Sequence, residues 1–154
     1  MHVFCIVYRK EQSSKSDCQV SQLWPYSTLL GKDGRIEPLE DYLFDQGLEV
    51  MVPEFEGGEE HITKVHRDKL ARCDAALIYF GKGTRAWVET KLMDLMQAPG
   101  YGREKEWLAK SVYVGPPEDR RKKRFKTHFA ELIQAESAFD QTLVEPFVNS
   151  LKTN

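Results

Sequence analysis

A glycine-rich turn is the first part of the sequence whose residue types and spacing could do chemistry. Residues 81–86 (GKGTRA) fit the pattern G-x-G-x-x-[G/A], in which backbone N–H groups at a helix N-terminus hold a phosphate. Lys82 and Arg85 add positive charge beside Gly81 and Gly83. The turn follows the third predicted strand rather than the first, and no acidic residue ends a strand about 20 residues later, so a Rossmann dehydrogenase is not indicated. An ordinary tight turn with solvated charges remains an open interpretation.

Two short segments of opposite charge stand out from a balanced total of 22 basic and 24 acidic residues. The net charge of -2 gives no overall attraction to nucleic acid or to a membrane surface, so we expect neither as a partner. Residues 53–60 (PEFEGGEE) and 120–124 (RRKKR) can attract each other between copies, which favours a head-to-tail homo-oligomer. Solvated surface segments are the alternative interpretation. The candidate interface residues are Glu54, Glu56, Glu59, Glu60, Arg120, Arg121, Lys122 and Lys123.

Metal and disulfide chemistry find no support in the sequence. The three cysteines show no CxxC spacing, and the closely spaced His61 and His66 have no matched cysteine or carboxylate. No apolar run approaches the roughly 20 residues that span a bilayer. We therefore expect a cytoplasmic domain with no metal site and no required cofactor, in which Cys5 and Cys73 are buried core residues.

Apolar runs and helical periodicities alternate along the chain. Each predicted strand is a short apolar run, and each predicted helix carries apolar residues at steps of three and four. In the third helix the inward stripe is Val88, Leu92, Leu95 and Met96, and in the last helix it is Leu143, Phe147 and Leu151. The predicted strands are residues 3–8, 48–52, 74–80, 111–114 and 130–135. The predicted helices are about 36–46, a second that runs out near Cys73, a third that ends before Pro99, and a last of about 142–152.

This alternation predicts an α/β domain with parallel strands joined by right-handed crossovers. We expect a flavodoxin-like three-layer sandwich with a five-stranded parallel sheet in the order 2-1-3-4-5. The continuous apolar character of residues 3–8 and 77–80 places these two strands at the centre of the sheet. Residues 1–154 form one domain, and a chain that starts in strand-like sequence and stops after one helix suits a domain taken from a longer protein.

A stretch around the third strand carries a resemblance to a known family. Residues 73–92 (CDAALIYFGKGTRAWVETKL), together with 53–60, resemble the pattern of bacterial TIR (Toll/interleukin-1 receptor) domains, and DYLFDQGLEV and GYGR are further points of likeness. The specific likeness covers residues 36–96. The resemblance implies a signalling or assembly domain of a bacterial sensor or defence protein, which acts through contacts with other copies or with fused sensor or ATPase domains.

The resemblance also implies an alternative, because many TIR domains hydrolyse NAD with a glutamate four residues after a tryptophan. Here that position after Trp87 is Lys91, and an ammonium group would repel positive charge that develops on the ribose. Glu89 is two residues along, which is about 200° around a helix. The assembly function is therefore preferred, and a non-standard NAD glycohydrolase would need Glu89 or Glu56 as its acid. NAD, as ligand or substrate, would contact the Gly81–Lys82–Gly83 turn, Trp87 and Lys91.

Overall fold

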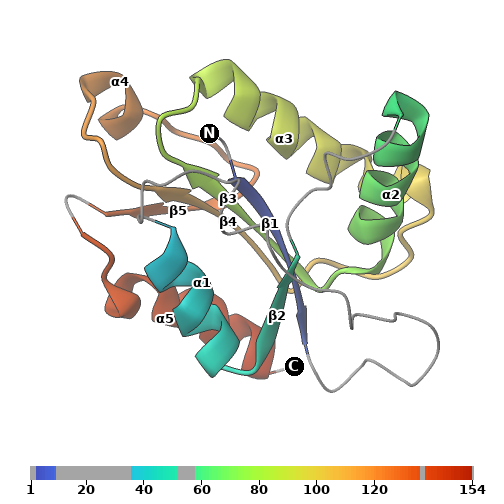
Figure 1. Cartoon of the computed structure of the whole chain (residues 1–154), viewed down its shortest axis with the longest axis horizontal. Helices are drawn as coiled ribbons and strands as arrows, with labels where there is room; N and C mark the ends of the chain where they lie inside the picture. The colour runs from blue at the N-terminus through green and yellow to red at the C-terminus, as the bar shows by residue number, and fades with distance from the viewer. Residues whose placement is uncertain (1–2, 10–35, 52–57, 136–137, 154) are drawn as a thin grey trace.

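A computed structural model describes residues 3–9, 36–51, 58–135 and 138–153 of the chain (Figure 1). Strands and helices alternate along most of this length, as the sequence predicts. The elements are β1 (Val3–Arg9), α1 (Glu37–Asp45), β2 (Leu48–Met51), α2 (Glu59–Arg72), β3 (Ala75–Phe80), α3 (Arg85–Gln97), the 3-10 helix η3 (Ala98–Tyr101), β4 (Ala109–Val114), α4 (Arg120–Lys123), β5 (Glu131–Gln134) and α5 (Gln141–Lys152).

The strands form one sheet in the order β2-β1-β3-β4-β5. β3, β4 and β5 are parallel, with Leu77 opposite Ser111 and Val112 opposite Leu132. β1 runs antiparallel to both of its neighbours, β2 and β3. The prediction of a five-stranded parallel sheet is therefore wrong in the direction of β1, and the structure is an α/β domain with a three-stranded parallel unit.

The reversal of β1 has a simple physical reason. A continuous apolar run indicates that both faces of a strand are covered, but it does not encode the direction in which the strand runs. Parallel and antiparallel ladders both satisfy the backbone N–H and C=O groups of a central strand. The prediction assumed a right-handed crossover between the first two strands, whereas β2 pairs antiparallel to β1.

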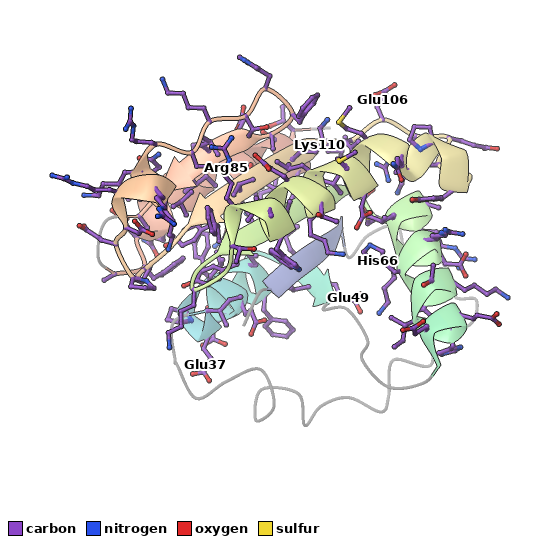
Figure 2. The ribbon with its side chains drawn as sticks, turned by 90° about the horizontal axis from the view of Figure 1, so that it is seen from above. Glu37, Glu49, His66, Arg85, Glu106 and Lys110 are labelled. Carbon is purple, nitrogen blue, oxygen red and sulfur yellow. The ribbon has the colours of Figure 1, made fainter. Side chains whose placement is uncertain are left out.

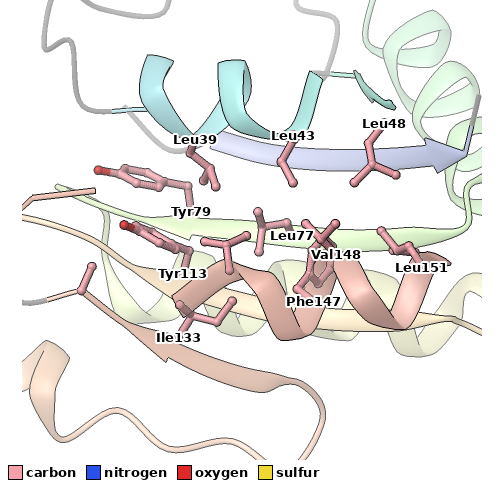
Figure 3. Close-up of a cluster of buried hydrophobic side chains, with 13 residues drawn as sticks. Leu39, Leu43, Leu48, Leu77, Tyr79, Tyr113, Ile133, Phe147, Val148 and Leu151 are labelled. Carbon is pink, nitrogen blue, oxygen red and sulfur yellow. The ribbon is translucent and has the colours of Figure 1, made fainter. Parts of the chain in front are cut away.

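Helices α1 and α5 cover one face of the sheet. Leu39 and Leu43 of α1 and Phe147 of α5 meet Leu77 and Tyr113 in a buried cluster (Figure 3). The last helix points Val144, Phe147, Val148 and Leu151 inward, whereas Leu143 is 38% exposed. The predicted stripe was wrong at Leu143, because one residue is about 100° around a helix and Val144 takes the inward position.

The other face of the sheet is covered by α3, with α2, η3 and α4 beside it (Figure 1). Val88, Leu92 and Leu95 of α3 are buried as predicted, but Met96 is 50% exposed. Val88, Leu92 and Leu95, at positions i, i+4 and i+7, already form the buried stripe. Met96 is exposed because it lies about 100° around the helix from Leu95. The inward face of α3 is therefore narrower than the sequence suggested.

The ends of the helices are fixed by identifiable groups. Gly47 follows the C-terminal end of α1, and its φ of 77° is a backbone conformation that suits glycine. α2 ends against the buried guanidinium of Arg103, which donates to the carbonyl oxygens of Leu70 and Cys73 at 2.9 Å each. The same guanidinium lies 3.6 Å from the centre of the Trp107 ring. Arg103 thus ties the C-terminal end of α2 to the segment that precedes β4.

The direction of β1 can be tested by cross-linking across the sheet. In the antiparallel register Val7 is paired with Val50, so oxidation of the Val7→Cys/Val50→Cys variant should give an intramolecular disulfide that peptide mapping detects. The control is Val3→Cys/Glu49→Cys, because Glu49 is paired with Tyr8, five residues from Val3. That distance of about 17 Å along the strand prevents cross-linking. A disulfide in the control and none in the first variant would contradict the reversed strand.

Candidate functional site

The carboxyl ends of the parallel strands lead into the segments that the sequence marked for function. β3 ends at Phe80 and passes through the 81–84 turn into α3, and β4 ends at Val114 and passes towards α4. In sheets of this kind ligands usually sit at this edge. The predicted turn residues Gly81, Lys82 and Gly83 do lie here, directly before α3.

The ring of Tyr79 accounts for the glycine at the start of this turn. A Cβ atom at Gly81 would lie 2.6 Å from Cε1 of Tyr79, and one at Gly115 would lie 2.7 Å from its hydroxyl oxygen. Both positions must therefore be glycine for the ring to pack there. Tyr79 also stacks on Tyr113, with ring centroids 5.7 Å apart. Close packing explains Gly81 without a bound phosphate.

The first turn of α3 is closed by its own side chains. The Thr84 hydroxyl accepts the Trp87 N–H at 3.2 Å, which satisfies one of the free donors at the helix start. Arg85 donates to Glu89 at 2.7 Å on the exposed side of the helix. Glu89 therefore faces solvent beside Arg85, and it does not share the face of Trp87, as the 200° separation predicted.

The opposite side of α3 carries Trp87, Lys91 and Asp94. The Lys91 Nζ donates to Oδ2 of Asp94 at 3.0 Å, and Nε2 of His66 lies 3.4 Å from the same oxygen. Figure 2 shows His66 on the side of α2 that faces α3. All four side chains are partly buried. The carboxylate on the Trp87 side of this helix is thus Asp94, which sequence reasoning missed.

A signal for Asp94 was present in the sequence. Asp94 is seven residues after Trp87 and three after Lys91, so all three fall on one helical face. His66 could not have been added from spacing, because α2 and α3 meet only in the tertiary structure. The side chain of His66 is only 18% exposed, so it is not a simple surface position of α2.

The environment of Asp94 keeps it ionised. Burial by itself would raise the pKa of this carboxyl, but the Lys91 ammonium and the His66 imidazole beside it outweigh burial and lower the pKa below its usual range. Both neighbours contact the same carboxylate oxygen, Oδ2, which holds the carboxylate between α2 and α3. The cluster is well suited to join α2 to α3 and poorly suited to act as a general base.

The basic run divides into one buried and several exposed side chains. Lys122 is only 6% exposed, donates to the carbonyl oxygens of Gly115 and Pro117, and lies 5.3 Å from the centre of the Phe80 ring. Lys122 therefore holds α4 on the end of the sheet, and its predicted place in an interface is wrong. Its neighbours Arg120, Arg121 and Lys123 are exposed.

The acidic candidates are only partly described. Glu59 and Glu60 are exposed in the first turn of α2, where negative charge is favourable to the helix dipole. Glu54 and Glu56 lie outside the described residues. Within the described ranges no group of three His, Cys, Asp or Glu side chains could hold a metal ion.

Two further properties bear on the chemistry available. Burial raises the pKa of the Cys73 thiol to about 11, although the charges of Arg103 and Lys105 oppose this, so the thiol is not a nucleophile at neutral pH. The expected burial of Cys73 is confirmed. In the described part of the chain, none of the helices combines the length and apolar character that crossing a membrane requires.

Comparisons with known protein families, with curated proteins and with solved structures give no match to this chain. Function must therefore be inferred from the residues themselves.

The role of Asp94 can be tested through the pH dependence of stability. We expect Asp94→Asn to lower the free energy of unfolding by about 1 kcal/mol at neutral pH, because the contacts with Lys91 and His66 are charge-assisted. The folded-state pKa is below the unfolded value, so this contribution is complete above the unfolded pKa and is lost as pH falls through the folded one. The difference between variant and wild type should therefore begin to shrink near the unfolded pKa of about 3.9 and be lost only below the lower folded-state pKa.

The matched control for urea unfolding is Glu89→Gln on the exposed side of the same helix. Its ion pair with Arg85 is solvent-exposed, so we expect a change of less than about 0.5 kcal/mol. Equal effects of both substitutions at neutral pH would contradict a special role for Asp94.

Proposed function

We propose that this domain is a TIR-type assembly module with a flavodoxin-like arrangement, which transmits a signal through contacts between copies in a cytoplasmic sensor or defence protein. The observation that carries the proposal is the separation of its charged surfaces. The acidic surface, Glu59 and Glu60, opens α2, and the basic surface, Arg120, Arg121 and Arg124, surrounds α4. Figures 1 and 2 show α2 and α4 on opposite sides of the molecule.

Surfaces of opposite charge on opposite sides support a head-to-tail contact. In such a contact the basic surface of one copy meets the acidic surface of the next, and each copy keeps one surface of each kind free. The contact can continue along a chain of copies, which is the geometry of a filament or ring. Exposed charges of this kind mainly increase the rate and specificity of association.

The arrangement of α3 disfavours the alternative, an NAD glycohydrolase. Lys91 occupies the position where the resemblance implies a catalytic glutamate, and its ammonium group is bound to Asp94. Glu89 is paired with Arg85 on the exposed side of the helix. Neither described carboxylate is free to stabilise a developing ribosyl cation beside Trp87.

We expect charge reversal on α4 to weaken self-association. The double variant Arg120→Glu/Arg121→Glu should move the sedimentation profile towards monomer, and raised salt should do the same for wild type, because exposed charges are screened beyond about 8 Å. The charge-matched control is Arg72→Glu/Lys152→Glu, two exposed residues outside both surfaces. Mixing the α4 variant with Glu59→Lys/Glu60→Lys should restore association between the two. The proposal would be falsified if wild type assembled equally well at low and high salt and the Arg120→Glu/Arg121→Glu variant assembled as well as wild type.

We expect weak or absent NAD cleavage by the isolated domain, even when copies are clustered artificially. Chromatography is used to measure the release of nicotinamide by wild type and by three variants, Glu89→Gln, Glu56→Gln and Lys91→Glu. Activity that appears only in Lys91→Glu would show that the rest of the site is competent. Robust turnover in wild type that is lost in Glu89→Gln or Glu56→Gln would instead establish the enzyme.

A further inference from the structure

A shallow, open surface hollow of about 340 Å³, called the α4 cavity below, lies at α4, and every residue that lines it is basic. Its volume is near the lower limit of the range in which proteins bind small ligands. The lining surface is largely carbon, since the aliphatic stems of the basic side chains form the wall, as arginine and lysine commonly do. The four lining residues are Arg120, Arg121, Lys123 and Arg124.

The cavity is built on a fixed base. Beneath it, Lys122 is bound to the carbonyl oxygens of Gly115 and Pro117. Phe125 is buried and meets Phe80 edge-to-face, with ring centroids 5.6 Å apart. Lys122 and Phe125, three residues apart, therefore point inward, whereas Arg120, Arg121, Lys123 and Arg124 are exposed.

The arginines of this cavity have no carboxylate partner within the described ranges, and Lys123 is bound to Glu118 at 3.1 Å. Like charges held within one short helix repel each other, so an anion that binds among them relieves an unfavourable interaction. Guanidinium groups match phosphate oxygens with two parallel hydrogen bonds. Because the charges lie on four of five consecutive residues of one small surface, they match a compact anion better than an extended nucleic-acid strand.

We propose that the α4 cavity binds the phosphate chain of a small polyphosphate ligand, either inorganic or carried by a nucleotide. This site differs from the glycine turn at residues 81–84, where close packing against Tyr79 explains Gly81. Binding would neutralise the basic surface and so oppose assembly. That regulatory consequence depends on the proposed function, whereas the binding itself does not.

The test is calorimetric titration of the full chain with inorganic tripolyphosphate, at low salt and at a protein concentration where sedimentation shows monomer. We expect saturable binding that weakens by more than about tenfold in Arg120→Gln/Arg121→Gln, because each removes a charge from the cavity. The charge-matched control is Lys64→Gln/Lys126→Gln, two exposed lysines outside the cavity, and we expect it to bind within about twofold of wild type. Repeating the titration with a nucleoside triphosphate and with the nucleoside alone distinguishes the inorganic from the nucleotide source.

Three outcomes would overturn the proposal. The first is no binding of tripolyphosphate at millimolar concentration, and the second is equal weakening in the arginine and lysine variants. The third is loss of binding in Lys82→Gln while Arg120→Gln/Arg121→Gln still binds, which would place the anion at the glycine turn. Binding of a single-stranded oligonucleotide without binding of tripolyphosphate belongs to the first outcome. A failure of wild type to self-associate leaves the titration unaffected, so the two proposals can fail separately.

Discussion

Complete burial of β3 between two layers of helices is the constraint on which the rest of the structure depends. All six residues of the strand are buried, and its side chains alternate between two cores. Leu77 and Tyr79 face the α1 and α5 layer, whereas Ile78 and Phe80 face α3 and Phe125. Each neighbouring element is positioned by contact with this strand. Tyr79 in turn requires glycine at both Gly81 and Gly115, so the core decides the sequence of the loops at the carboxyl edge.

Helix α3 packs on the buried sheet through one face and carries different polar side chains on its other two sides. Its buried stripe fixes the rotation of the helix on the sheet, and this rotation places Glu89 in solvent with Arg85. The same rotation turns Lys91 and Asp94 towards α2, where His66 completes the cluster. A substitution that preserves the stripe can therefore change the chemistry of either face without disturbing the core. Because of this separation, Lys91 and not Glu89 lies on the Trp87 side of α3. The identity of Lys91 therefore distinguishes the proposed assembly function from the alternative of NAD cleavage.

The basic run at α4 combines one buried, structural side chain with several exposed ones, for which we propose a binding function. Lys122 serves the fold, because its buried ammonium group is satisfied by two backbone carbonyl oxygens. Its neighbours lie at the surface, and we propose that their exposed guanidinium groups bind a partner copy or an anion. The two proposals for this surface are linked, since a polyphosphate and an acidic helix start would compete for the same cations. Such competition would allow a small anion to regulate assembly.

The sequence by itself determined the approximate positions of the five strands and the four longer helices, and that Glu89 does not share the face of Trp87 on α3. These features follow from local rules: apolar runs and helical periodicity of about 100° per residue. Only the tertiary structure decided that β1 runs antiparallel, that Lys122 is buried, and that His66 meets Asp94. Each of these depends on contacts between residues far apart in the chain or on the direction in which the chain re-enters the sheet. An apolar or charged pattern records how much a segment is buried or hydrated on average, and it contains no information about which partner it meets.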